Sequence, residues 1–281
     1  MEETKKPTED KIVLGKKKNA NPEIPAEFID QEFKVLTDDV ELPSLGTFYP
    51  TGQKTVKVKY LTAEEDDILF SPELLKSGKV LDALLQIAVV DPTLTAEDML
   101  VGDRNTVLIH LRKNGLGNMY NPGLLQCPSC KEEYDPDIDL NKLKLKYLED
   151  KPNENGEYDF TMPLMKSKIK FRFLNGHDEN KLMKSGKSTT KKKGSSYKIS
   201  KIVTERYRLQ IMEVDGNRDK IYISRFVSAM PMKDSLTFRE YVRLVSPGVD
   251  FNYSFECKNC GHVYEDDVPL TPKLFYPNAD I

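Results

Sequence analysis

The sequence predicts an α+β fold made of two pseudo-repeated halves, each with a β-hairpin, helices and a turn that carries two cysteines. Two observations lead to this prediction. The four cysteines form two Cys-x-x-Cys pairs, Cys127 with Cys130 and Cys257 with Cys260. In addition, the segments around the two pairs match each other, in the same order along the chain. We therefore interpret residues 38–145 and 157–273 as related copies.

The segments that follow the two pairs share their pattern. Cys130 is followed by KEEYDPDIDL and Cys260 by GHVYEDDVPL. Tyr, Asp, an aliphatic residue and Leu recur at the same distances from the second cysteine of each pair. The alternation over residues 137–140 predicts a short edge strand beside the cysteines.

A second match lies upstream of each pair, where VKVKYLTAEEDDIL (residues 56–69) aligns with IKFRFLNGHDENKL (residues 169–182). Both begin with alternating apolar and basic residues, which predicts a half-buried strand. Thr62 or Asn175 then provides an N-cap before an acidic helix start, and Thr62 with Glu65 predicts a capping box. Shorter strands that end in proline, VELP and FTMP, precede these segments and complete the hairpins.

Helical patterns and boundaries complete the predicted organisation. The helical patterns cover residues 80–90, 95–100, 106–113, 200–214, 218–229 and 236–244. In each half a helix with an arginine, Arg112 or Arg243, leads into a glycine-containing turn before the cysteine pair. The predicted parts are a disordered N-terminal arm (1–24), a first half (25–149), a second half (150–273) with a lysine-rich loop (184–200), and a C-terminal tail (274–281).

Composition excludes several classes of protein. The 281 residues are 38% hydrophobic, which allows one or two domains with a core. Charged residues make up 31% but nearly cancel, at a net charge of −3, so no global field is directed at nucleic acid or an anionic membrane. No apolar run spans a bilayer and no secretory signal begins the chain, so we expect a reducing compartment. Cysteines there are metal ligands more often than disulfides.

Two Cys-x-x-Cys pairs supply the four thiolates of a closed, tetrahedral, structural Zn²⁺ site. Cys127, Cys130, Cys257 and Cys260 are the expected ligands, and this four-cysteine zinc ribbon would join the two halves. The alternatives are two unrelated pairs or a redox motif. A redox motif requires a helix start after the pair, whereas strand-like segments follow both pairs here. His262 is expected beside the site rather than in it, and structural roles are expected for His110 and His177.

No catalytic constellation is present, so the sequence predicts a protein that is not an enzyme and has no small-molecule substrate. The chain contains no nucleotide-binding glycine loop, no Gly-x-Ser-x-Gly and no His-Glu-x-x-His. The acidic clusters at residues 64–67 and 265–267 are interpreted as a helix start and a solvated strand edge. The lysine run at residues 191–193 is interpreted as a solvated loop, with phosphate contact or docking of an acidic partner as alternatives.

Several motifs together resemble the baseplate hub proteins of T4-like myoviruses. They are LPSLGTFYP (residues 42–50), the segment 56–69, and the stretch 103–140 with its Asp-Arg start, Gly-x-x-Tyr turn, CPxC and Asp-Ile-x-Leu. The resemblance covers residues 38–143 well and the second half only through its parallel pattern. The lysine-rich loop and the absence of a CPxC proline at the second pair depart from it.

This resemblance implies a structural or assembly-assisting component of the central hub of a phage tail baseplate, without catalysis. The implied partners are other tail and baseplate proteins, and the implied location is the virion tail after synthesis in the bacterial host cytoplasm.

Two other functions stay open at the level of sequence. The alternative function is a zinc-ribbon module that binds nucleic acid or serves transcription, although acids around both cysteine pairs would repel phosphate. A metalloenzyme would require an open coordination position, which four thiolates do not leave.

Overall fold

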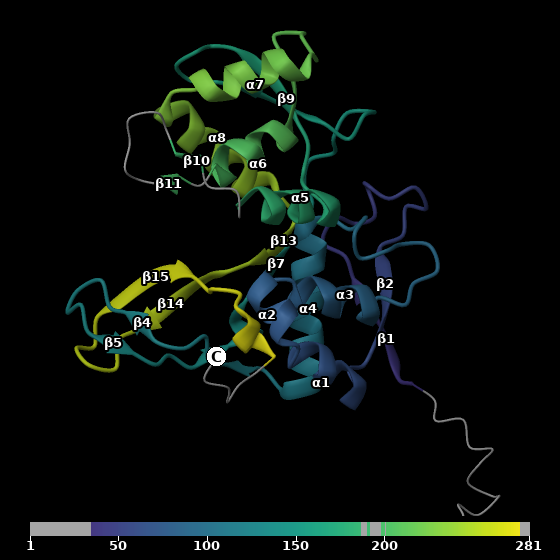
Figure 1. Ribbon diagram of the computed structural model, residues 1–281, viewed down its shortest axis with the longest axis vertical. Coiled ribbons are helices and arrows are strands. Elements are labelled where there is room, and N and C mark those ends of the chain that lie inside the picture. The colour runs from purple at the N-terminus through teal and green to yellow at the C-terminus, as the bar shows by residue number, and fades with distance from the viewer. Residues whose placement is uncertain (1–34, 187–189, 192–197, 200, 276–281) are drawn as a thin grey trace, which may run out of the picture. The chain divides into compact units, whose positions relative to one another are not determined.

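Helices and short antiparallel sheets build the chain, as the computed structural model in Figure 1 shows. The structure describes residues 35–186, 190–191, 198–199 and 201–275. The predicted arm (1–24), most of the lysine-rich loop (184–200) and all but the first two residues of the predicted tail (274–281) lie outside this part. Leu36–Ile281 forms one unit and Met1–Val35 another. The description below concerns the first of these.

The first half begins with the predicted hairpin, in which Val40 lies opposite Val56. The predicted capping box also forms, because the Glu65 carboxylate accepts hydrogen bonds from the Thr62 backbone N–H (2.7 Å) and hydroxyl (2.8 Å). Its elements before the first cysteine pair are β1 (Thr37–Glu41), β2 (Thr55–Lys59), α1 (Ala63–Leu69), α2 (Pro72–Ser77), α3 (Val80–Ala88) and α4 (Val101–Leu116).

The second half also begins with a hairpin, in which Phe160 lies opposite Ile169. Asn175 caps the following helix, since its side-chain oxygen accepts the Asp178 N–H at 3.2 Å while the Asp178 carboxylate accepts the Asn175 N–H at 3.3 Å. Its elements are β8 (Tyr158–Thr161), β9 (Lys168–Phe171), α5 (Gly176–Gly186), β10 (Thr190–Lys191), β11 (Lys198–Ile199), α6 (Ile202–Gln210), β12 (Ile211–Val214), α7 (Lys220–Ala229) and α8 (Met232–Val245).

Several predicted helices have different limits in the structure, among them the one predicted over 236–244, since α8 begins at Met232. The helix predicted over 200–214 ends at Gln210. The prediction is wrong for the residues that follow, because they form β12, which pairs with β9 in a three-stranded sheet. Residues 95–100 form a turn held by the Thr95 and Asp98 side chains (2.6 Å) instead of a helix. α4 begins at Val101, well before the predicted start at 106. Tertiary pairing overrides local propensity in these places.

Several backbone hydrogen bonds recur at matching positions of the two halves. Leu42 N–H donates to Lys54 O at 2.8 Å, and Met162 N–H donates to Ser167 O at 2.9 Å. The Asp103 carboxylate at the start of α4 accepts the Ser44 N–H at 3.0 Å. At the start of α8, Asp234 accepts the Leu164 N–H at 2.7 Å. Both aspartates are fully buried. α3 and α6 are each nine residues long and each begins after a lysine.

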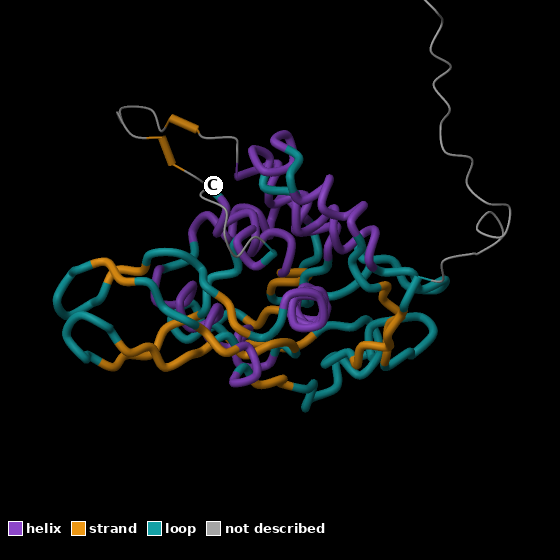
Figure 2. The backbone as a smooth tube through the Cα atoms, turned by 90° about the horizontal axis from the view of Figure 1, so that it is seen from below, coloured by secondary structure: helices purple, strands orange, loops and turns teal. Residues whose placement is uncertain are grey.

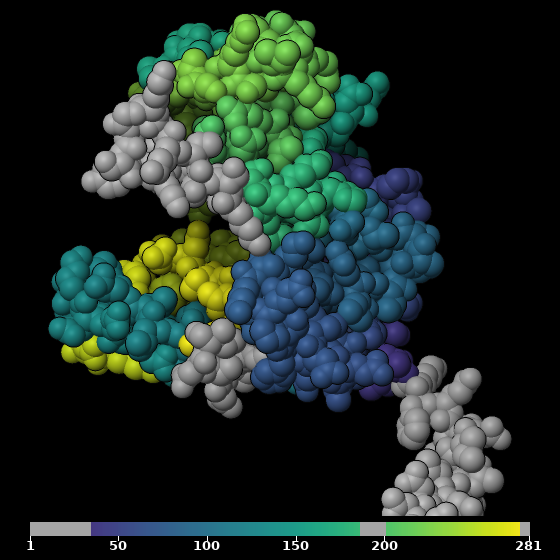
Figure 3. Space-filling model, viewed as in Figure 1, coloured from purple at the N-terminus to yellow at the C-terminus, as the bar shows by residue number. Residues whose placement is uncertain are grey.

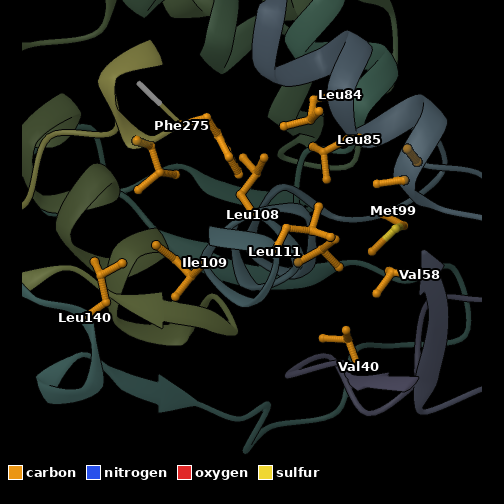
Figure 4. Close-up of a cluster of buried hydrophobic side chains, with 14 of the residues drawn as sticks. Val40, Val58, Leu84, Leu85, Met99, Leu108, Ile109, Leu111, Leu140 and Phe275 are labelled. Atoms are coloured by element: carbon orange, nitrogen blue, oxygen red, sulfur yellow. The ribbon is translucent and has the colours of Figure 1, made fainter. Parts of the chain in front are cut away.

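Buried side chains form two large cores, and each core contains residues of both halves, such as Phe255 in the first and Leu100 in the second. The first is built mainly on α3, α4 and the β1–β2 hairpin, and Figure 4 shows Leu84, Leu108 and Phe275 within it. Leu274 and Phe275 reach this core from the far end of the chain. The second core is aromatic and centres on Phe171 and Phe238, whose rings meet edge to face at 5.3 Å between centroids.

The two halves meet at the start of α4. Val101 N–H donates to Leu174 O at 3.0 Å. The buried guanidinium of Arg104 bridges the halves, since it pairs with Asp82 (2.5 Å) of the first and Glu179 (3.1 Å) of the second. Gly102 allows the backbone of Pro247 to pack on α4, because a Cβ there would lie 1.9 Å from Pro247 O.

Candidate metal centre

Two β-hairpins carry the four cysteines, and Figures 1 and 2 show them lying side by side. The first cysteine pair follows β4 and precedes β5, and the second follows β14 and precedes β15. Strands around the site are β3 (Met119–Tyr120), β4 (Leu125–Gln126), β5 (Glu133–Tyr134), β6 (Ile138–Asp139), β7 (Lys144–Lys146), β13 (Gly248–Asp250), β14 (Asn252–Glu256) and β15 (Val263–Asp267). The 3₁₀ turns are Leu140–Lys142 and Pro272–Leu274.

The turns at the two cysteine pairs have the same backbone. Cys127 N–H donates to Glu132 O at 3.0 Å, and Cys257 N–H donates to His262 O at 2.9 Å. The residue after each second cysteine is left-handed, Lys131 with φ 65° and Gly261 with φ 70°. Such a turn directs both thiols of a pair to the same side. Glycine adopts this conformation without strain, whereas Lys131 does so at some cost.

The two turns bring all four sulfur atoms together, as the sequence predicted. The four Sγ atoms all lie within 4.8 Å of one another. Cys127 Sγ lies 3.8 Å from Cys260 Sγ, and Cys130 Sγ lies 3.8 Å from Cys257 Sγ. A regular tetrahedron of sulfurs about 2.3 Å from a central Zn²⁺ has edges of about 3.8 Å. The donor set and its spacing therefore fit a four-thiolate metal site.

The thiols differ in how readily they ionise. Burial opposes ionisation of Cys127, but N–H donors of Cys130 and Ser129 outweigh it and lower its thiol pKa to about 6. At Cys130 the Glu132 N–H favours the thiolate, yet burial and the neighbouring thiols raise the pKa to about 12. One thiolate therefore disfavours the next, and a dication at the centre would supply the charge that four thiolates need.

Further contacts tie the two hairpins to each other around the cysteines. The Tyr134 and Tyr264 hydroxyls hydrogen-bond at 2.8 Å, and Tyr134 packs with Cys127 and Cys257 in a small buried cluster. Lys258 Nζ lies 3.1 Å from Asp137 Oδ2. These contacts join residues of the first half to residues of the second.

The other residues considered from sequence lie outside the cluster. His262 is exposed and stacks on Tyr264 with ring centroids 6.1 Å apart. His110 Nε2 lies 2.9 Å from Asp38, and His177 Nε2 lies 3.2 Å from Asp98. Among the described residues, the four cysteines are the only group of His, Cys, Asp and Glu placed to hold a metal ion. Neither cysteine pair starts a helix, which disfavours the redox alternative.

Comparison with known proteins identifies a family for this chain. The family model described as T4 bacteriophage base plate protein matches residues 43–270, which is most of the chain and contains both cysteine pairs. The chain belongs to the T4 bacteriophage base plate protein family. No curated protein and no solved structure matches it. The described helices of this base plate protein include none that is long and apolar enough to cross a membrane.

Two buried aspartates matter to this base plate protein in ways that sequence analysis missed. Asp103 also accepts a hydrogen bond from the Tyr49 hydroxyl, and burial raises the pKa of its carboxyl. Asp234 also accepts the Met165 N–H at 2.9 Å. An aspartate in the first turn of a predicted helix suggests an interaction with that helix end, but not with a distant hairpin.

Proposed function

We propose that this chain is a structural or assembly component of the baseplate hub of a phage tail and acts through protein–protein contacts. Membership of the base plate family supports the baseplate role. The position in the hub rests on the resemblance of residues 38–143 to hub proteins. The proposed partners are other tail and baseplate proteins, and the proposed location is the virion tail. The proposed role requires no catalysis.

The proposal assigns Cys127, Cys130, Cys257 and Cys260 to a structural Zn²⁺. The main support for this assignment is that the four Sγ atoms lie within 4.8 Å of one another, although the cysteine pairs belong to different halves of the chain. When bound, zinc would supply stabilisation without chemistry, because four thiolates leave no position for water. The two hairpins would then be clamped, and through them the two halves.

We also propose that the halves, with limits near 25–149 and 150–273, arose as copies of one unit. The matching hairpin registers, helix caps, buried aspartates and cysteine turns support this proposal. The copies are not independent domains, since Leu148 packs in the second core while Leu274 and Phe275 pack in the first. The metal clamp would hold together two halves that already exchange segments.

Elemental analysis of the purified chain tests the clamp. We expect about one zinc per chain, lost in Cys257→Ser, because three thiolates do not close the site. Hydrogen exchange of the same variant should then increase in both halves, since each half supplies one cysteine pair. Ser129→Ala is a matched control in the first turn, and it should keep its zinc. Loosening of the second half alone would contradict a shared site.

The location can be tested separately. Mass spectrometry of purified particles should find the chain in tails that contain the hub, and immunogold labelling should place it at the baseplate. Presence only in assembly intermediates would indicate an assembly factor instead of a permanent component. Absence from both would contradict the proposed role, whatever the zinc content.

A further inference from the structure

A cavity of about 440 Å³ lies between α5, α6 and α8 on one side and β13 on the other. Figure 3 shows the molecule hollowed between the green segment that contains α6 and the yellow segment that contains β14 and β15. Its apolar wall includes Phe173, Leu182, Val242 and Phe251. A volume of this size can accept a few side chains of a bound segment.

Three arginines line the cavity without a protein partner for their guanidinium groups among the described residues. Arg206 comes from α6, and Arg239 and Arg243 lie one turn apart on α8. All three are exposed. Lys146, also in the lining, donates to the carbonyl of Arg243.

Three carboxylates also line the cavity, and one of them is already paired with a cation outside the lining. Glu179 pairs with the buried Arg104 at 3.1 Å. Asp250 accepts the Asn252 N–H at 3.2 Å. Asp267 is the third. The four cations therefore outnumber the acids available to neutralise them, and the cavity favours an anionic occupant.

The matching face of the first half shows what such a surface can hold. When α3 is aligned with α6 from their first residues, Leu84 corresponds to Arg206. When α4 is aligned with α8 in the same way, Leu108 corresponds to Arg239. Leu84 and Leu108 are buried, in a core that the C-terminal residues Leu274 and Phe275 complete (Figure 4). In the second half arginines replace these two leucines, and both arginines are exposed.

We propose that the α6–α8 cavity docks an acidic peptide segment of a partner chain, anchored by apolar side chains. Its carboxylates would meet Arg206, Arg239 and Arg243, and its apolar residues would lie against Phe173 and Leu182. The segment would take the place that Leu274 and Phe275 occupy in the first half. This inference rests on the proposed assembly role and identifies one surface by which it operates.

The apolar wall of the cavity favours one kind of anionic occupant over others. Phosphate or a nucleic acid backbone would use the arginines but would leave the apolar wall in contact with water. An acidic segment with Leu or Phe uses both parts, because apolar anchors fill pockets while charges orient the segment.

Fluorescence anisotropy with a defined probe tests this proposal on the full chain. The probe is the labelled peptide Ac-EELFEDLE-NH₂, with inorganic phosphate and oligo(dT) as competitors. We expect saturable binding that weakens with salt, and at least about a tenfold loss in Arg239→Glu/Arg243→Glu. The lysine peptide Ac-KKLFKKLK-NH₂ should bind that variant more tightly than it binds the original chain.

Lys220→Glu/Arg225→Glu on α7 makes the same change of charge outside the cavity and is the matched control. It should bind the acidic peptide as the original chain does. An equal loss of affinity for the acidic peptide in both variants would mean that only the net charge of the chain matters, and it would overturn the proposal. Displacement of the peptide by millimolar phosphate or by oligo(dT), or no binding of the peptide, would also overturn it.

Particle incorporation separates this inference from the proposed function. If Arg239→Glu/Arg243→Glu chains keep their fold and zinc but fail to enter tails, both proposals gain support. If they enter tails as efficiently as the control variant, the cavity is not an assembly surface, while the baseplate role is unaffected. Circular dichroism and metal content of each variant establish that the fold is intact.

Discussion

The two halves share a backbone plan but differ in what covers their helices. In the first half, residues from the end of the chain cover α3 and α4 and complete an aliphatic core. In the second half, the third strand β12 extends the sheet, and the corresponding face of α6 and α8 borders an open cavity lined by arginines. The same arrangement of hairpin and helices can therefore form part of a closed core or border an open cavity.

The largest change in the free energy of unfolding is expected when residues are exchanged between corresponding positions of the two halves. Leu108→Arg would place a charge without a partner in the first core, and we expect a loss of more than about 4 kcal/mol in the free energy of unfolding. The reciprocal change, Arg239→Leu, should alter it by less than about 0.5 kcal/mol, because that side chain is exposed. Urea denaturation of both variants provides the measurement. Similar costs would mean that the two faces are not equivalent.

A smaller effect is expected where the halves meet. Arg104→Ala would leave Asp82 and Glu179 without their shared cation, at a cost of about 3 kcal/mol. Ser235 holds the corresponding position in the second half, and Ser235→Ala should cost about 1 kcal/mol through its hydrogen bond to Tyr207. Denaturation curves of the two variants can be compared directly. A mild effect of Arg104→Ala would show that the interface depends on backbone contacts instead.

The smallest effects expected are pH dependences of stability, of which the first comes from Glu157 in the second half. Arg218 holds Glu157 through two hydrogen bonds (2.9 and 2.8 Å) and lowers its pKa below the ordinary 4.5. Its stabilisation is therefore present above about pH 4.5 and is lost as the pH falls through the lowered pKa. Glu157→Gln should cost about 1 kcal/mol at neutral pH, since Arg218 is half exposed, and nothing in strong acid.

Asp103 in the first half should respond to pH in the opposite direction. Burial raises the pKa of its carboxyl, so its stabilisation is complete below the ordinary 3.8 and is lost as the pH rises through the raised pKa. The difference in unfolding free energy between the original chain and Asp103→Asn should therefore narrow from acid to neutral pH. Denaturation of both variants from pH 3 to 7 measures it. A gap that widens would contradict a raised pKa.

Local features whose signals are short in range could be predicted from the sequence. The two cysteine pairs, the hairpins with alternating residues, and the caps at Thr62 and Asn175 follow from neighbours a few positions apart, and each has its expected geometry. The convergence of the cysteines could be predicted because a single pair cannot complete a tetrahedral site, which requires a distant second pair.

The segments that cover each helix face come from distant parts of the chain and could not be predicted from the sequence. Ile211–Val214 has helical periodicity but becomes a strand, because β9 offers backbone partners. Phe275 looks like part of an exposed tail in sequence, yet it completes the first core, since burial of its ring outweighs the cost of ordering that end. The arginines of α6 and α8 gather into one cavity only when the helices pack. Their spacing in the sequence does not predict that packing, because contacts between elements depend on the whole chain.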